Sequence, residues 1–231
     1  MKKIKLGELS WLLGILLCAL GVHFAVRSGF GVSMVVAPAY VLHRAISPVW
    51  EWFSFGTAEY CLQGLLVILL AIVLRKFKWK YPLAFFTAML YGFSLDFWNL
   101  LFGEGVFTAM PARIFSLAAS MLITGLAIAL FLRSYLPQQV YELIVKELTD
   151  HFGWNMTKVK WIYDGCSLLF SILLMLLLFR RFDTGMVGIG TLVVTLLNAP
   201  IMAMWGKLLD RLFSFEPALP KLYDSFEKYF D

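Results

Sequence analysis

The feature that most constrains the fold of this chain is a series of long apolar runs whose charged residues lie near their ends. A helix needs about 20 consecutive apolar residues to cross the hydrocarbon core of a bilayer. The runs are too long for β-strands, and they lack the polar–apolar alternation of a membrane β-barrel. We therefore predict an all-α polytopic membrane protein with six transmembrane helices. The predicted spans are residues 10–26, 60–74, 81–102, 112–132, 161–179 and 185–205.

The composition excludes a soluble fold. Apolar residues make up 61% of the chain and charged residues only 15%, whereas a soluble domain has roughly 45–50% and about 25%. Lipid can cover the excess apolar surface, so the bilayer is the first expected partner. The net charge of +5 does not indicate nucleic-acid binding, because Lys and Arg lie at the ends of the apolar runs, where they set membrane orientation.

The distribution of basic residues predicts that orientation. With the N-terminus inside, 15 of the 20 Lys and Arg residues fall on the inner side and the other five fall outside. Both termini are therefore predicted to be cytoplasmic. The adjacent pair Arg180 and Arg181 is the one local departure from the rule. The five outer residues are Arg27, Arg44, Arg113, Arg180 and Arg181.

Three segments outside the spans have their own pattern. Residues 27–45 form an apolar stretch that is too short to cross and is interrupted by Gly29, Gly31 and Pro38, so protein or a water-filled cavity must cover its backbone. We predict an amphipathic helix in the membrane interface at residues 138–152 and another in the cytoplasmic tail, residues 207–231. In residues 138–152, the apolar face holds Tyr141, Ile144, Val145, Leu148 and Phe152, and the polar face holds Glu142, Lys146, Glu147 and Asp150.

The two halves of the chain resemble each other at an offset near 105 residues. LRKF at 74–77 parallels FRRF at 179–182, and EYC at 59–61 is echoed by YDGC at 163–166. Each copy holds three spans, so the second copy enters from the opposite side and an inverted repeat is predicted. We predict a single transmembrane domain at 1–206, with repeat one at about 9–105 and repeat two at about 110–206. The alternative is that apolar helices with basic ends resemble one another without duplication.

Four glycine-, proline- and apolar-rich motifs are spread over nearly the whole chain. They are SGFGVSMVVAPAYVL at 28–42, SFGTAEYCLQG at 54–64, KVKWIYD at 158–164 and GIGTLVVTLLNAP at 188–200. With these motifs the sequence resembles the YitT/YczE-type bacterial integral membrane proteins, a family without an established general function. The resemblance implies a location in the bacterial inner membrane. It implies no reaction, so a site has to be argued from the residues.

Polar side chains at membrane depth form the candidate site, because an ionisable group inside a span is unfavourable unless it is paired or hydrated. We predict an outer group in which Arg27 meets Glu59 and Asp96, and an inner group at the corresponding positions of the second repeat. One alternative is a structural role, in which buried pairs fix the helix register and touch no substrate. Another is simple exposure at the membrane interface, as for Asp164 beside Lys160. The candidate substrate or ion path comprises Arg27, Glu59, Gln63, Asp96 and Asn99 in the outer half and Arg133, Asp164 and Asn198 in the inner half.

The favoured function is a small carrier that moves a small solute by alternating access, because inverted repeats with broken helices build the sites of many secondary transporters. An alternative is a membrane-embedded binding or accessory subunit that acts with a partner protein. An intramembrane enzyme is the least favoured, because no nucleophile–base arrangement, Walker loop or dinucleotide fingerprint is present. Metal-ligand spacings are also missing, so we expect no catalytic residue, metal or cofactor. A homodimer through small-residue helix faces stays open.

Overall fold

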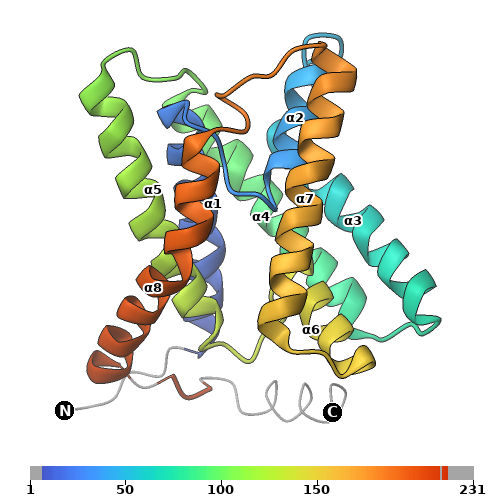
Figure 1. Cartoon of the computed structure of the whole chain (residues 1–231). Helices are drawn as coiled ribbons and strands as arrows, with labels where there is room; N and C mark the ends of the chain where they lie inside the picture. The colour runs from blue at the N-terminus through green and yellow to red at the C-terminus, as the bar shows by residue number, and fades with distance from the viewer. Residues whose placement is uncertain (1–6, 214, 218–231) are drawn as a thin grey trace.

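The computed structural model describes residues 7–213 and 215–217, and within them the protein consists of eight α-helices without a strand (Figure 1). The prediction of an all-α fold is therefore confirmed. The predicted amphipathic tail lies mostly outside the described residues. The helices are α1 Gly7–Ser28, α2 Ala37–Ile46, α3 Phe55–Leu74, α4 Lys80–Phe102, α5 Met110–Phe131, α6 Val140–Phe152, α7 Met156–Phe179 and α8 Ile189–Leu212.

Six of these helices, α1, α3, α4, α5, α7 and α8, are long and apolar enough to cross a membrane. They contain 20–24 residues, which corresponds to about 30–36 Å of helix at 1.5 Å per residue. The remaining two, α2 with 10 residues and α6 with 13, are too short to cross. The chain is thus a multi-pass membrane protein with the number of spans that the apolar runs predicted.

The helix ends differ from the predicted boundaries where capping groups, rather than hydropathy, decide them. Helix α3 begins five residues earlier than predicted, because the Ser54 side chain accepts a hydrogen bond from the Thr57 backbone N–H and caps it. Helix α8 begins at Ile189 and continues to Leu212, seven residues past the predicted end. Its last turns contain Asp210, which pairs with Arg133 at 2.6 Å and so allows the helix to continue beyond the apolar run.

The short helices lie at opposite ends of the molecule, which we call the α2 end and the α6 end (Figure 1). Helix α2 packs against α3 and α7, whereas α6 packs against α3, α4 and α7. In Figure 1, α8 lies on the left beside α5, and α7 lies on the right. The order long, short, long, long therefore occurs twice along the chain, in α1–α4 and again in α5–α8.

Helices α1 and α5 form the most extensive helix pair, and small residues allow their close approach. Ser116 donates a hydrogen bond to the Phe24 carbonyl oxygen at 2.7 Å. A methyl group added at Gly21 would overlap the Thr124 side chain and crowd the Ser120 carbonyl. The small-residue face of α5 thus serves packing within the chain.

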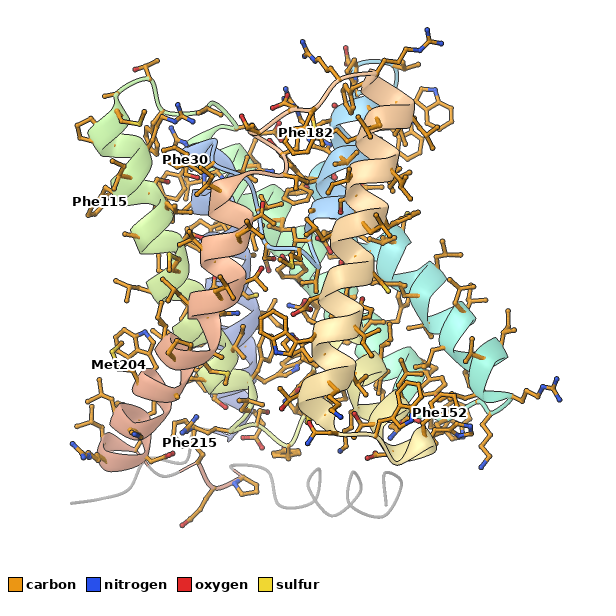
Figure 2. All side chains as sticks on the ribbon, in the orientation of Figure 1. Phe30, Phe115, Phe152, Phe182, Met204 and Phe215 are labelled. Carbon is orange, nitrogen blue, oxygen red and sulfur yellow. The ribbon has the colours of Figure 1, made fainter. Side chains whose placement is uncertain are left out.

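The outer surface of the bundle is apolar. Phe115 on α5 is 73% exposed and Met204 on α8 is 51% exposed, and both project away from the bundle in Figure 2. Exposed apolar surface on this scale would cause aggregation of a soluble protein, but lipid covers it in a bilayer.

Candidate functional site

The best-defined polar group inside the bundle surrounds Glu59, in the second turn of α3. The Glu59 side chain is fully buried. Its Oε2 atom accepts hydrogen bonds from Gln63 Nε2 at 3.1 Å and from the Tyr141 hydroxyl at 2.7 Å. The Gln63 Oε1 atom in turn accepts a hydrogen bond from the Val140 backbone N–H at 3.3 Å. Glu59 and Gln63 therefore tie α3 to the start of α6, which comes from the other half of the chain.

Two buried polar atoms in this group have no hydrogen-bond partner among the described residues. They are Glu59 Oε1 and the hydroxyl of Tyr91, which α4 contributes and which is also fully buried. Tyr91 interacts electrostatically with Glu59 and with Cys18 on α1. None of the ion pairs in the described part of the chain includes Glu59. A buried carboxylate normally has a cationic partner, so this arrangement is unusual for a purely structural residue.

A second acidic group lies nearer the α6 end. Burial raises the pKa of Glu142 on α6, and the Lys160 charge only partly opposes this effect. Glu142 Oε2 is buried without a hydrogen-bond partner among the described residues. Asp164 on α7 is 5% exposed, and its Oδ1 atom lies 3.6 Å from Lys160 Nζ. Tyr163 interacts electrostatically with Glu59 as well as with Glu142 and Asp164.

A cavity of about 250 Å³ opens beside Glu142 at the α6 end. It is formed by the start of α4, by the segment between α5 and α6, and by α6 itself. Lys80 and Lys146 line it together with Glu142, so the wall carries both charges. The full lining consists of Lys80, Ala84, Ser134, Tyr135, Leu136, Pro137, Gln138, Glu142, Leu143 and Lys146.

The amphipathic helix at residues 138–152 is present as α6, but one residue of its predicted polar face is buried. Glu147 is 2% exposed and pairs with Lys78 at 2.7 Å and with Lys80. The Tyr81 hydroxyl also donates a hydrogen bond to it at 3.2 Å. Burial alone would raise the pKa of Glu147, but the two lysines hold it below its ordinary value. The prediction of an exposed polar face was wrong at this position because α6 packs against the basic start of α4.

The structure does not join Arg27, Glu59 and Asp96 by any hydrogen bond or ion pair within the described residues. Asp96 instead caps the start of α3: its Oδ1 accepts from the Gly56 backbone N–H at 2.9 Å and its Oδ2 from the Ser54 hydroxyl at 2.7 Å. A carboxylate at this position satisfies backbone donors and stabilises the positive end of the helix dipole. Asp96 thus has a sufficient structural role.

Arg27 caps another helix, whereas Arg133 caps its own helix α5 through the Ala129 carbonyl oxygen at 2.7 Å and links it to α8. Arg27 Nη1 donates to the Phe102 carbonyl oxygen at 3.0 Å, at the end of α4. Arg133 Nη2 donates to the Gly206 carbonyl oxygen at 2.8 Å in α8 and also pairs with Asp210. Free carbonyls at helix ends attract such cations. Both arginines are therefore accounted for by helix packing.

The last two predicted residues lie apart from the Glu59 group. Asn99 Oδ1 lies 2.7 Å from Nδ1 of His23, a buried histidine of α1 that the sequence reasoning left out. Asn198 is half-buried in α8, and its Oδ1 has no hydrogen-bond partner among the described residues. Arg133, Asp164 and Asn198 make no hydrogen bond or ion pair with one another in the described part of the chain.

Sequence reasoning did not select the aromatic residues that complete the site. Tyr141 was placed on the apolar face of its helix, and that face packs against Glu59. A tyrosine hydroxyl on a buried helix face usually has a polar partner. The position of Tyr141 on that face could therefore have indicated that it belongs to the site. No group of three or more His, Cys, Asp or Glu side chains able to hold a metal occurs in the residues that the structure describes.

Comparison with known proteins places the chain in a family. The model of a "Family of unknown function (DUF6198)" matches residues 6–207. The chain is similar to "Uncharacterized protein YyaS" of Bacillus subtilis (strain 168), with 23% identity over 205 residues that cover 87% of this chain and 92% of that protein. No solved structure matches. Since the family model spans most of the chain, this protein belongs to the DUF6198 family of unknown function.

Proposed function

We propose that this protein is a small membrane carrier of an unidentified small solute, and that Glu59 lies at its binding site. The observation that carries the proposal is the state of the Glu59 carboxylate. It is fully buried, it is hydrogen-bonded to residues from both halves of the chain, and its Oε1 atom has no hydrogen-bond partner among the described residues, so that it can bind a ligand. An ionisable group within a span is unfavourable enough to suggest a functional role.

The duplicated order of helices supports a carrier. The order long, short, long, long occurs twice, and the short helices lie at opposite ends of the molecule (Figure 1). Arg75 and Arg180, which are the two non-glycine residues with positive φ in the described part of the chain, end α3 and α7 at equivalent positions, 105 residues apart. Helices α1 and α5 also occupy equivalent places in the two halves: Arg27 lies in the last turn of α1, and Arg133 lies two residues after the end of α5. These parallels favour an inverted repeat, the usual architecture of secondary transporters.

The proposal includes a location and an orientation. We place the protein in the bacterial inner membrane with both termini in the cytoplasm, because most of its Lys and Arg residues would then face inward. The α6 end, with its 250 Å³ cavity, would be the cytoplasmic end. A relationship to the YitT/YczE-type proteins, inferred from the four sequence motifs, belongs to the same proposal. We also propose that the protein has no enzymatic activity.

A ligand screen tests the proposal. The purified protein is melted in detergent with a panel of metabolites, vitamins, lipids and ions, because a ligand that binds the folded state raises the melting temperature. At a ligand concentration of 100 Kd the stabilisation is about 2.7 kcal/mol. The shift should disappear in Glu59→Gln and persist in Glu51→Gln, which changes an exposed glutamate of the loop before α3.

Uptake into proteoliposomes then separates a carrier from a binding subunit. Radiolabelled ligand from the screen should enter vesicles that contain the protein and stay outside vesicles that contain Glu59→Gln. A ligand that binds but never enters would refute the carrier and favour the membrane-embedded binding or accessory subunit. A ligand whose thermal shift survives in Glu59→Gln would place the site elsewhere.

A further inference from the structure

We propose that Glu59 is a proton-binding site, and that its proton exchanges with the α6 end through Tyr141, Tyr163 and Glu142. The inference deepens the proposed function, on which it rests, because it names the proton as the ion that the carrier uses. It follows from the groups around Glu59, from the two open polar atoms and from the line of titratable side chains that leads to the cavity.

Among the residues that the structure describes, the groups that face Glu59 contain no cation. Its own helix contributes Gln63, α4 contributes Tyr91, and α6 contributes Tyr141. Cys18 of α1 and Tyr163 of α7 also interact with it electrostatically. All these side chains are uncharged near neutral pH. A buried ionised carboxylate without a counter-ion is strongly unfavourable, and such a group neutralises itself by taking up a proton.

Helix α2, which also packs against α3, does not supply the missing charge, because its Arg44 is exposed and forms no ion pair with Glu59 within the described residues. Its Tyr40 and His43 contact the ring of Phe55, one turn before Glu59. His43 is already engaged: its Nδ1 lies 3.0 Å from the Phe53 carbonyl oxygen and its Nε2 lies 3.7 Å from the Glu104 carboxylate. The proton is thus the simplest partner that balances Glu59 in this packed conformation.

The hydrogen bonds show where the proton binds. Oε2 already accepts two hydrogen bonds, from Gln63 and Tyr141, whereas Oε1 has no partner among the described residues. A proton that arrives along the route forms an O–H bond at Oε2 as the Tyr141 hydroxyl breaks its own O–H bond, and Tyr141 regains a proton from the α6 side. Rotation of the neutral carboxyl group about its Cγ–Cδ bond then carries the O–H to the unpaired position of Oε1. No electron is transferred. The neutral acid and the open Tyr91 hydroxyl can then both bond to a solute.

A line of titratable side chains joins this site to the α6 end. The ring centroids of Tyr141 and Tyr163 lie 6.4 Å apart. Tyr163 interacts electrostatically with Glu142, which lines the 250 Å³ cavity and has a buried oxygen without a partner among the described residues. Burial raises the pKa of Glu142, so this residue can hold a proton closer to neutral pH than an exposed glutamate can.

Infrared spectroscopy on the full chain in lipid tests the proton site directly. A protonated carboxyl group that is shielded from water gives its own C=O stretching band. At neutral pH the wild type should show such a band. Glu59→Gln should remove it and Glu51→Gln should retain it. An unchanged carboxylic-acid band in Glu59→Gln would overturn the proposal, because Glu59 would then be ionised.

A further variant keeps the test valid if Glu59→Gln does not fold. Tyr141→Phe removes the hydrogen bond to Oε2 and should shift the frequency of the Glu59 band. A band at the unchanged frequency would belong to another residue and would count against the assignment.

The rate of exchange into D₂O tests the route. Deuteration shifts the band, so its rate can be followed after a change of buffer. Glu142→Gln should retain the band and slow its shift by about 10²-fold, the lower end of what a positioned acid–base group contributes to proton transfer. An unchanged rate would refute the route through Glu142. A Glu59 band without any solute uptake would refute the carrier and leave the proton site intact, so the two failures can be told apart.

Discussion

The ion pairs of Glu147 offer a quantitative test of how α6 is held against α4. Glu147 is 2% exposed, whereas the side chains of Lys80 and Lys78 are 17% and 44% exposed. Glu147→Gln removes the negative charge and leaves both lysines without their partner. A hydrogen bond to a charged group contributes about 1.5–3 kcal/mol. Because solvent reaches Lys78, we expect a smaller loss, about 1–2 kcal/mol.

The same variant should change how stability depends on pH. The pKa of Glu147 is lower in the folded protein than its ordinary value. The contribution of Glu147 to the free energy of unfolding is therefore fully present above the ordinary glutamate pKa and is lost as the pH falls through the pKa of Glu147 in the folded protein. The wild type should lose stability in this acidic range. Glu147→Gln should be less stable than the wild type at neutral pH, and the difference should shrink as the pH falls.

Thermal unfolding in detergent measures both effects. A loss of 1–2 kcal/mol corresponds to a melting temperature lower by about 2–8 °C for a chain of 150–250 residues. Asp150→Asn is the matched control, since it removes a negative charge from an exposed position of the same helix. An equal change in Asp150→Asn would show that net charge, rather than the buried pair, is responsible. A melting temperature unaffected by Glu147→Gln would refute the reasoning.

Two further predictions concern the contact between α3 and α4. Asp96→Ala removes the cap of α3 and should lower the stability by about 0.5–2 kcal/mol, which thermal unfolding measures. The ligand-induced rise in melting temperature should survive in this variant. Its loss would return Asp96 to the binding site. Gly56→Val should prevent folding, because a side chain there meets the Gly92 carbonyl oxygen. Gly165→Val, at a position with open space, is the control and should fold normally. Equal yields of monodisperse protein from Gly56→Val and Gly165→Val would contradict the close approach of α3 and α4.

Part of the candidate site could be predicted from sequence, because burying an ionisable group at membrane depth always requires an explanation. Glu59 and Gln63 were selected on that ground, and both belong to the buried group. Arg27 and Asp96 were selected by the same rule, but they cap helices that lie elsewhere in the sequence. Hydropathy identifies a polar residue at depth, but it carries no information on which helix end or side chain will lie beside it.

By itself the sequence determined that the chain is a helical membrane protein with six spans, because apolar runs of this length have no other stable solution in a bilayer. The tertiary structure alone decided which polar groups meet. Tyr141 reaches Glu59 from 82 residues away, and Glu147 is buried by lysines 67 and 69 residues before it. Such pairings depend on how α6 packs against α3 and α4, and local patterns along the chain do not record the packing of distant helices.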